Sequence, residues 1–140
     1  MNTPTEQTVA FLHEPLVAVL ATVDRQGRPH AMPIWYLYED GVILMSAGRG
    51  SQKHRNLEYN PSATLVVDQR ETPYYAVMVR GRAEIGPPLD PEQHERLSIR
   101  YLGEEAGKRY AERTIGHDAI TIRLTPEDWF EFHGSAGTDD

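Results

Sequence analysis

Cysteine is absent from the 140-residue chain. The protein therefore has no disulfide scaffold, no thiolate nucleophile and no cysteine-ligated zinc or iron–sulfur centre. Long apolar runs are absent as well, since none approaches the roughly 18 residues that a membrane-spanning helix needs. The first residues, Met1–Glu6, have neither the basic nor the apolar region of a secretion signal. We therefore expect a cytoplasmic protein that does not cross a membrane.

Basic residues are also few. The chain has 14 Lys and Arg against 21 Asp and Glu, which gives a net charge of −7. Such a surface repels nucleic acid at long range, so we do not expect nucleic acid as a partner. The exception is the segment from Arg49 to Arg55, which is locally basic.

The common motifs for metal binding and for serine hydrolases are missing. No two of the six histidines lie at the i, i+4 spacing of a helical metal site. No serine lies in a Gly-x-Ser-x-Gly turn. We therefore predict no metal site, and we interpret the histidines as ordinary core or surface residues.

The chain length suits one domain, which we assign to residues 1–133, followed by a disordered tail at 134–140. Apolar runs rich in β-branched residues predict strands. These strands span 16–23, 29–39, 42–46, 63–68, 74–85 and 119–124, and a turn at 125–128 leads to 129–132. Capping patterns predict helices, which begin at Thr3, Ser51 and Asp90 as N-caps, and a further helix near 104–113.

These elements indicate a mainly β protein with a few flanking helices. The connections between the first three strands are too short for a crossover, so a three-stranded antiparallel meander is expected. Asp40-Gly41 is typical of the tight hairpin turn between the second and third strands. About six antiparallel strands favour a small barrel over a sandwich.

The basic segment is the first candidate binding site. Its glycines allow backbone to approach a ligand, and the first turn of the following helix offers unpaired N–H groups to an anion. Arg49, Ser51, Lys53 and Asn56 could then hold a phosphate. A solvated, exposed helix explains the same charges equally well.

The aromatic strand around Trp35 is the second candidate. Pro33 removes one backbone donor, which confines this strand to a sheet edge or a bulge, and bulges often lie beside binding sites. Core packing is the alternative interpretation, and it also fits Tyr74-Tyr75 and Trp129-Phe130.

The order of these segments resembles a known family. The strand ending Ala21-Thr22-Val23, the stretch 29–36, the segment 51–57 and the stretch 60–68 follow one another as in the pyridoxamine 5′-phosphate oxidase-like, FMN-binding split-barrel family. The likeness is greatest to its branch of F420-dependent flavin and deazaflavin oxidoreductases. The chain lacks the arginine-rich pattern and the C-terminal motif of true pyridoxamine phosphate oxidases, so vitamin B6 oxidation is not expected.

This resemblance implies a six-stranded antiparallel split β-barrel that forms a homodimer, with the cofactor in the groove between subunits. It places Lys53 on the phosphate, with Asn56 beside it and with Arg49 and Ser51 along the cofactor tail. The ring would lie against two strands and near Tyr75. The implied cofactor-binding residues are Pro33, Ile34, Trp35, Ser46, Ala47, Arg49, Ser51, Lys53, Asn56 and Tyr75.

The function implied is an F420-dependent reductase that transfers a hydride between the deazaflavin and a flat, conjugated small molecule. The alternatives are an FMN-dependent oxidoreductase and a non-catalytic carrier of flavin or haem in the same groove. Nothing in the sequence names a proton donor, so no catalytic residue is assigned.

Overall fold

The computed structural model describes residues 2–134. The tail prediction for 134–140 therefore lies outside the described residues, except for Gly134, whose backbone N–H donates to the carbonyl of Tyr74 at 2.9 Å. None of the helices within residues 2–134 is long and apolar enough to cross a lipid bilayer.

Seven strands and four helices make up the described part of the chain. In order they are α1 (Glu6–Leu12), β1 (Ala18–Val23), β2 (Pro29–Ile34), β3 (Leu37–Glu39), β4 (Val42–Gly48), α2 (Gln52–Tyr59), β5 (Ser62–Gln69), β6 (Tyr75–Gly86), α3 (Pro91–Leu102), α4 (Glu104–Thr114) and β7 (Ala119–His133).

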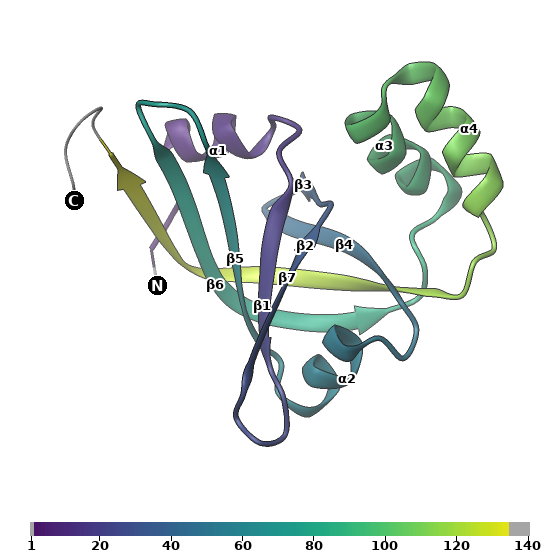
Figure 1. Cartoon of the computed structure of the whole chain (residues 1–140), viewed down its shortest axis with the longest axis horizontal. Helices are drawn as coiled ribbons and strands as arrows, with labels where there is room; N and C mark the ends of the chain where they lie inside the picture. Colours follow the sequence, from purple (N-terminus) through teal and green to yellow (C-terminus); the bar gives the residue numbers. More distant parts are fainter. Residues whose placement is uncertain (1, 135–140) are drawn as a thin grey trace.

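The strands form a single antiparallel sheet in the order β2-β1-β5-β6-β7-β4-β3. The two edge strands, β2 and β3, are consecutive in the chain and are joined by only Trp35 and Tyr36, so the sheet has to curl until its edges approach each other. Figure 1 shows this curled sheet, with α1 at its upper end and α2 at its lower end. The predicted mainly β, antiparallel split barrel is confirmed.

The predicted single strand over 29–39 and the meander built on it are wrong. The first half of this stretch pairs with β1, and the second half leaves β1 and pairs with β4, so β2 and β3 do not pair with each other. The strand ends just after Pro33, which lacks a backbone donor. Seven strands are therefore present where six were expected. Pro33 lies on an edge strand, as predicted.

The predicted turn at 125–128 is also wrong, because β7 runs without a break through it. β6 pairs with β7 from Thr121 to His133, and an irregularity in register at Arg80/Gly81 absorbs the extra residue. The backbone of β7 passes very close to Gly81 of β6. A Cβ added to this glycine would lie 2.1 Å from the carbonyl oxygen of Thr125. Thr125–Asp128 is thus a bulge and not a turn.

The helix caps at Ser51 and Asp90 are confirmed, the latter as a full capping box with Gln93. The first helix is capped at Thr5 instead of Thr3, since the Thr5 hydroxyl accepts from the backbone N–H of Thr8. Proline at the first helical position was the misleading signal.

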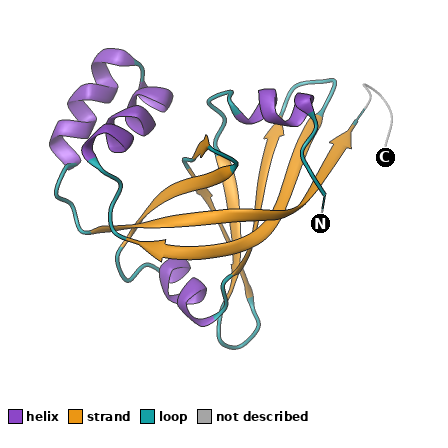
Figure 2. Cartoon of the chain, turned by 180° about the vertical axis from the view of Figure 1, so that it is seen from behind, coloured by secondary structure: helices purple, strands orange, loops and turns teal. Residues whose placement is uncertain are grey.

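Helices α3 and α4 pack against each other and stand to one side of the sheet, past β4 (Figure 2). Leu97 of α3 packs with Leu37 and Leu44 in a hydrophobic cluster separate from the barrel core. The two helices approach closely, since a Cβ on Gly107 would lie 2.5 Å from the Cα of Ile99. The helix pair thus forms a wall over the strand that carries Ser46 and Ala47.

We expect Gly81→Ala to destabilise the protein by about 2 kcal/mol, because the added methyl group overlaps backbone that cannot yield easily. Urea unfolding measures this change. Gly86→Ala, on the same strand with open space around the new Cβ, is the matched control. Equal stability of the two variants would contradict the close approach.

Candidate functional site

The two edges of the sheet leave a gap at which backbone groups lack strand partners. β3 pairs with β4 only through Val42–Leu44, so Met45–Gly48 have a neighbouring strand on the β7 side alone. β2 has β1 as its single neighbour. Unpaired strand edges offer N–H and C=O groups that a ligand can use.

A cavity of about 370 Å³ lies at this gap. It is lined by the end of β2, by β4, by the first turn of α2 and by the facing sides of α3 and α4. The lining residues are Val17, Pro33, Ile34, Trp35, Ser46, Ala47, Gly48, Lys53, His94, Leu97, Ser98 and Tyr110. Six of the ten predicted cofactor-binding residues therefore come together here: Pro33, Ile34, Trp35, Ser46, Ala47 and Lys53.

Trp35 is fixed in place by the helix pair. Its ring stacks on Tyr101 with centroids 4.8 Å apart, and it tilts against Tyr110 at 5.8 Å. The backbone N–H of Tyr36 donates to the Tyr101 hydroxyl at 3.1 Å, and that hydroxyl donates to the carbonyl of Leu16. The break between β2 and β3 is thus stabilised by a side chain from α3.

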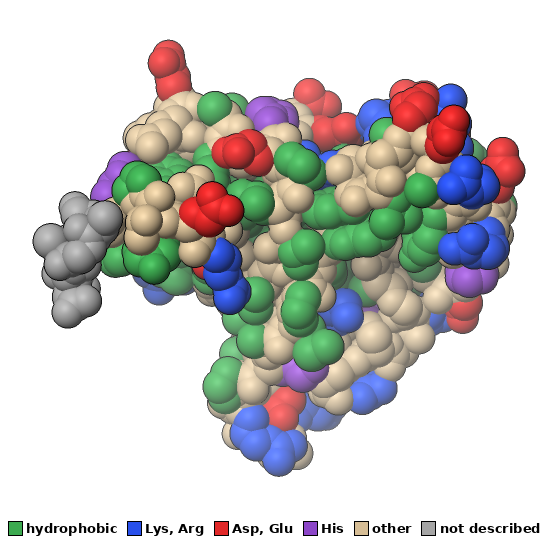
Figure 3. All heavy atoms as spheres, turned by 45° about the horizontal axis from the view of Figure 1, so that its top comes forward, with side chains coloured by type: hydrophobic (Ala, Val, Ile, Leu, Met, Phe, Trp, Pro, Cys, Tyr) green, Lys and Arg blue, Asp and Glu red, His purple; other side chains and the backbone are tan. Residues whose placement is uncertain are grey.

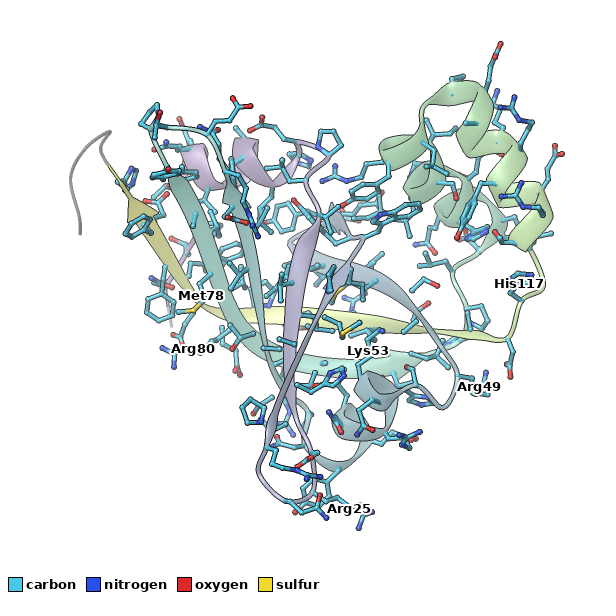
Figure 4. The ribbon with its side chains drawn as sticks, viewed as in Figure 1. Arg25, Arg49, Lys53, Met78, Arg80 and His117 are labelled. Atoms are coloured by element: carbon cyan, nitrogen blue, oxygen red, sulfur yellow. The ribbon has the colours of Figure 1, made fainter. Side chains whose placement is uncertain are left out.

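Lys53 is the cation of the basic segment that remains unpaired. Arg49 forms an ion pair with Asp118 at 2.8 Å, and Arg55 donates to the backbone carbonyl of Gly50 and to Gln52. Within residues 2–134, Lys53 makes neither a hydrogen bond nor an ion pair, and its half-buried side chain lines the cavity. Figure 4 labels both Arg49 and Lys53. Lys53 therefore has its positive charge available for an anion.

Ser51 and Asn56 lie beside the cavity and not in its lining. The Ser51 hydroxyl accepts from the N–H of His54 and caps α2. Asn56 is 3% exposed, donates to Thr22 at 3.0 Å and accepts from Gln52. In this chain both residues hold α2 in place.

Tyr75 lies outside this cavity in the single chain. Its ring packs edge-on against Phe11, with centroids 4.7 Å apart, and its hydroxyl donates to Glu131 at 2.8 Å. Thr5 and Thr8 donate to the same carboxylate. Hydrogen bonds from Thr5, Thr8 and Tyr75, in that order of importance, lower the pKa of Glu131 to about 2.

This low pKa makes the stability depend on pH. A carboxyl whose pKa is lower in the folded than in the unfolded chain adds stability above about pH 4.5, and the contribution is lost as the pH falls towards about 2. We expect Glu131→Gln to reduce stability at pH 7 and the deficit to shrink over that window. Urea midpoints across pH measure it, with Glu127→Gln, an exposed carboxylate of the same strand, as control. A deficit that is independent of pH would contradict this role.

Sequence reasoning missed the residues that the helix pair contributes, above all His94, Ser98 and Tyr110. Their helices were predicted, but which side of the helices faces the sheet depends on how the pair docks. No signal in the sequence reports that docking. Among residues 2–134 no three His, Asp or Glu side chains form a group that could hold a metal ion.

Comparison with known proteins agrees with this architecture. The sequence pattern of the pyridoxamine 5′-phosphate oxidase family matches residues 4–133. The chain belongs to this family. Its curled seven-stranded sheet is the split barrel of the family, which includes flavin-dependent oxidoreductases and also haem-binding proteins.

Three solved structures illustrate the range of similar proteins. An F420 reductase is 28% identical in sequence and superposes with a TM-score of 0.73. The match covers 91% of this chain and 98% of the reductase chain. The conserved hypothetical protein Rv2991 of Mycobacterium tuberculosis is 24% identical over 94% of this chain and 86% of its own, with a TM-score of 0.76. The haem storage protein HutZ of Vibrio cholerae is 23% identical over 94% and 98%, with a TM-score of 0.69.

Proposed function

We propose that this protein is an oxidoreductase that binds coenzyme F420 at the gap in its barrel and transfers a hydride between it and a flat, conjugated small molecule. The observation that carries this proposal is the unpaired Lys53 on the wall of a cavity that also contains the free backbone edge of β4. The similarity to an F420 reductase at 28% identity over 91% of the chain supports F420 over FMN, which is the alternative.

The residues present fit a flavin-type cofactor. A cavity of about 370 Å³ lies in the range of roughly 300–1,000 Å³ typical of small-molecule sites. Lys53 lies on α2, whereas Trp35, just after β2, and Ser46 of β4 lie across the same cavity. A ligand can therefore place its anionic group at the helix and its ring between the edges of β2 and β4. A lysine ammonium is a suitable point charge for a phosphate.

When bound, such a cofactor supplies the hydride chemistry itself, and the protein supplies binding and orientation. Lys53 would hold the phosphate. The unpaired backbone groups at Met45–Gly48 would hydrogen-bond the polar edge of the ring. Trp35, stacked on Tyr101, would form a fixed apolar wall that excludes water from one side.

Further cations lie near the end of the molecule that carries α2 and the β1–β2 turn. Figure 3 shows Lys and Arg side chains gathered towards its lower end, where α2 and the β1–β2 turn lie in Figure 1. The F420 tail carries carboxylates beyond its phosphate, and Arg55 of α2 is exposed there. This distribution of charge favours a long anionic cofactor.

The outer face of the sheet supports a homodimer. A row of five apolar side chains crosses five strands of this face, each residue paired with the next. All are exposed or half-buried in the single chain: Pro33, Val19, Val66, Met78 and Phe130. Figure 4 labels Met78, the member of this row on β6. A contiguous apolar row of this kind is typical of an interface. Because Pro33 also lines the cavity, a second copy on this face would lie at its rim.

The dimer is tested by placing a charge in the centre of this row. We expect Val66→Glu to convert a dimer into a monomer, because the interface would bury an unpaired carboxylate. Sedimentation velocity measures the mass. Gln26→Glu, which adds the same charge in an exposed turn, should remain dimeric. A wild-type protein that sediments as a monomer overturns this part of the proposal.

The role of Lys53 is tested by titration with F420 and with FMN. We expect Lys53→Ala to weaken F420 binding by about 1–3 kcal/mol, the range for a hydrogen bond to a charged group. Lys108→Ala removes the other lysine, which is exposed and paired with Glu104, and should leave the affinity unchanged. Equal dissociation constants for wild type and Lys53→Ala would refute the assignment.

The cofactor is identified by a thermal-shift screen against F420, FMN, FAD and haem, since a ligand that binds the native state raises Tm by mass action. We expect F420 to give the largest rise and the bound, reduced cofactor to be oxidised by an added conjugated acceptor. A rise with FMN alone would favour the FMN-dependent alternative. Binding of flavin or haem without any turnover would favour a carrier.

A further inference from the structure

A second cavity, of about 290 Å³, adjoins the first beneath the helix pair. The two share Ser46, Ala47, Gly48, His94 and Tyr110 in their linings, whereas Lys53 borders the first cavity only. The second cavity extends away from Lys53, along α4 to the loop before β7. Figure 4 labels His117 in that loop. A molecule bound there would lie next to the proposed cofactor site without using its anion-binding end.

The walls of this second cavity offer no free charge. Asp118 is the one Asp, Glu, Lys or Arg in its described lining, and it is paired with Arg49 at 2.8 Å. The remainder is largely apolar or aromatic, with Leu89, Ile115 and Tyr110 among the lining residues. An uncharged, flat molecule matches such walls, because a charged one would lose its hydration without gaining a partner.

His94 lies where the two cavities meet, and its protonation pattern follows from its neighbours. The Thr114 hydroxyl donates its single proton to the carbonyl of Tyr110 at 2.7 Å. The same oxygen lies 2.7 Å from Nε2 of His94, so it has to accept there. Nε2 of His94 therefore carries the proton, and in the neutral ring Nδ1 is left with a lone pair.

Nδ1 of His94 has no hydrogen-bond partner among residues 2–134. It is also absent from the buried polar atoms that lack a partner in this part of the chain, so it is accessible to solvent, and His94 lines both cavities. A fixed acceptor on an otherwise apolar wall selects ligands that present a donor.

We propose that the cavity beneath α3 and α4 binds the substrate as an uncharged planar molecule, and that Nδ1 of His94 accepts a hydrogen bond from an O–H or N–H group of that molecule. This inference deepens the proposed function, on which the role as substrate site rests. Binding of such a molecule can be measured without any cofactor.

The test compares indole with its N-methyl derivative and with indene, all flat and uncharged, of which only indole donates a hydrogen bond. Heteronuclear NMR titration of the cofactor-free protein gives the three dissociation constants. We expect indole to bind wild type more tightly than either analogue, by between about twofold and tenfold, the range for one neutral hydrogen bond. The free imidazole of His94 should show Nδ1 as its unprotonated nitrogen in the nitrogen-15 spectrum.

Two variants assign the preference to its residue. His94→Phe keeps a flat ring without an acceptor and should abolish the preference for indole. Thr114→Val keeps the shape of the side chain, releases Nε2 and should reduce the preference while the imidazole populates both tautomers. His117→Phe, a histidine of the same cavity, is the matched control and should retain the preference.

Equal affinity of wild type for the three probes, absence of saturable binding, or a preference that survives His94→Phe would each overturn the inference. Failure of the proposed function looks different. If F420 does not bind but the indole preference depends on His94, the cavity assignment stands and the cofactor assignment falls. If F420 binds through Lys53 but the preference is missing, the reverse holds.

Discussion

The incomplete pairing between β3 and β4 is the constraint on which the remaining features of the site depend. A closed barrel would satisfy its own backbone groups and leave none for a ligand. Here β3 is only three residues long, so Met45–Gly48 of β4 have no partner on that edge, and the opposite edge strand ends just after Pro33. The cavity and the free backbone groups follow from this gap, and Lys53 borders the cavity from α2.

The helix pair turns the gap into a defined pocket, because it is attached to the barrel at several points. Arg100 of α3 donates to the carbonyls of Leu12, His13 and Glu14 at the end of α1. Its guanidinium also lies 4.7 Å from the ring centre of Tyr36, whose burial raises the pKa of its hydroxyl. Arg96 binds Glu39 of β3 through two hydrogen bonds. These contacts hold His94 and Tyr110 over the strands, as a preorganised site requires.

Local sequence signals predicted the local structure well and the long-range pairing less well. The caps at Ser51 and Asp90 depend on near neighbours, and both were confirmed. The division of 29–39 depends on how the whole sheet curls, because its two halves end up at opposite edges of the sheet. The continuity of β7 depends on pairing with β6 and β4, which lie far along the chain. Both were mispredicted. The site follows the same pattern: Lys53 and Trp35 were found from motifs and resemblance, whereas His94 enters only through the docking of α3.

The central claim is that the gap between β2 and β4 is the cofactor site. Amide chemical-shift changes on addition of F420 test it most directly, because every backbone N–H reports its own surroundings. The account predicts that the largest changes fall on Ile34, Trp35, Met45–Gly48 and Lys53. Changes confined to the opposite end of the barrel, around Tyr75 and His133, would contradict it.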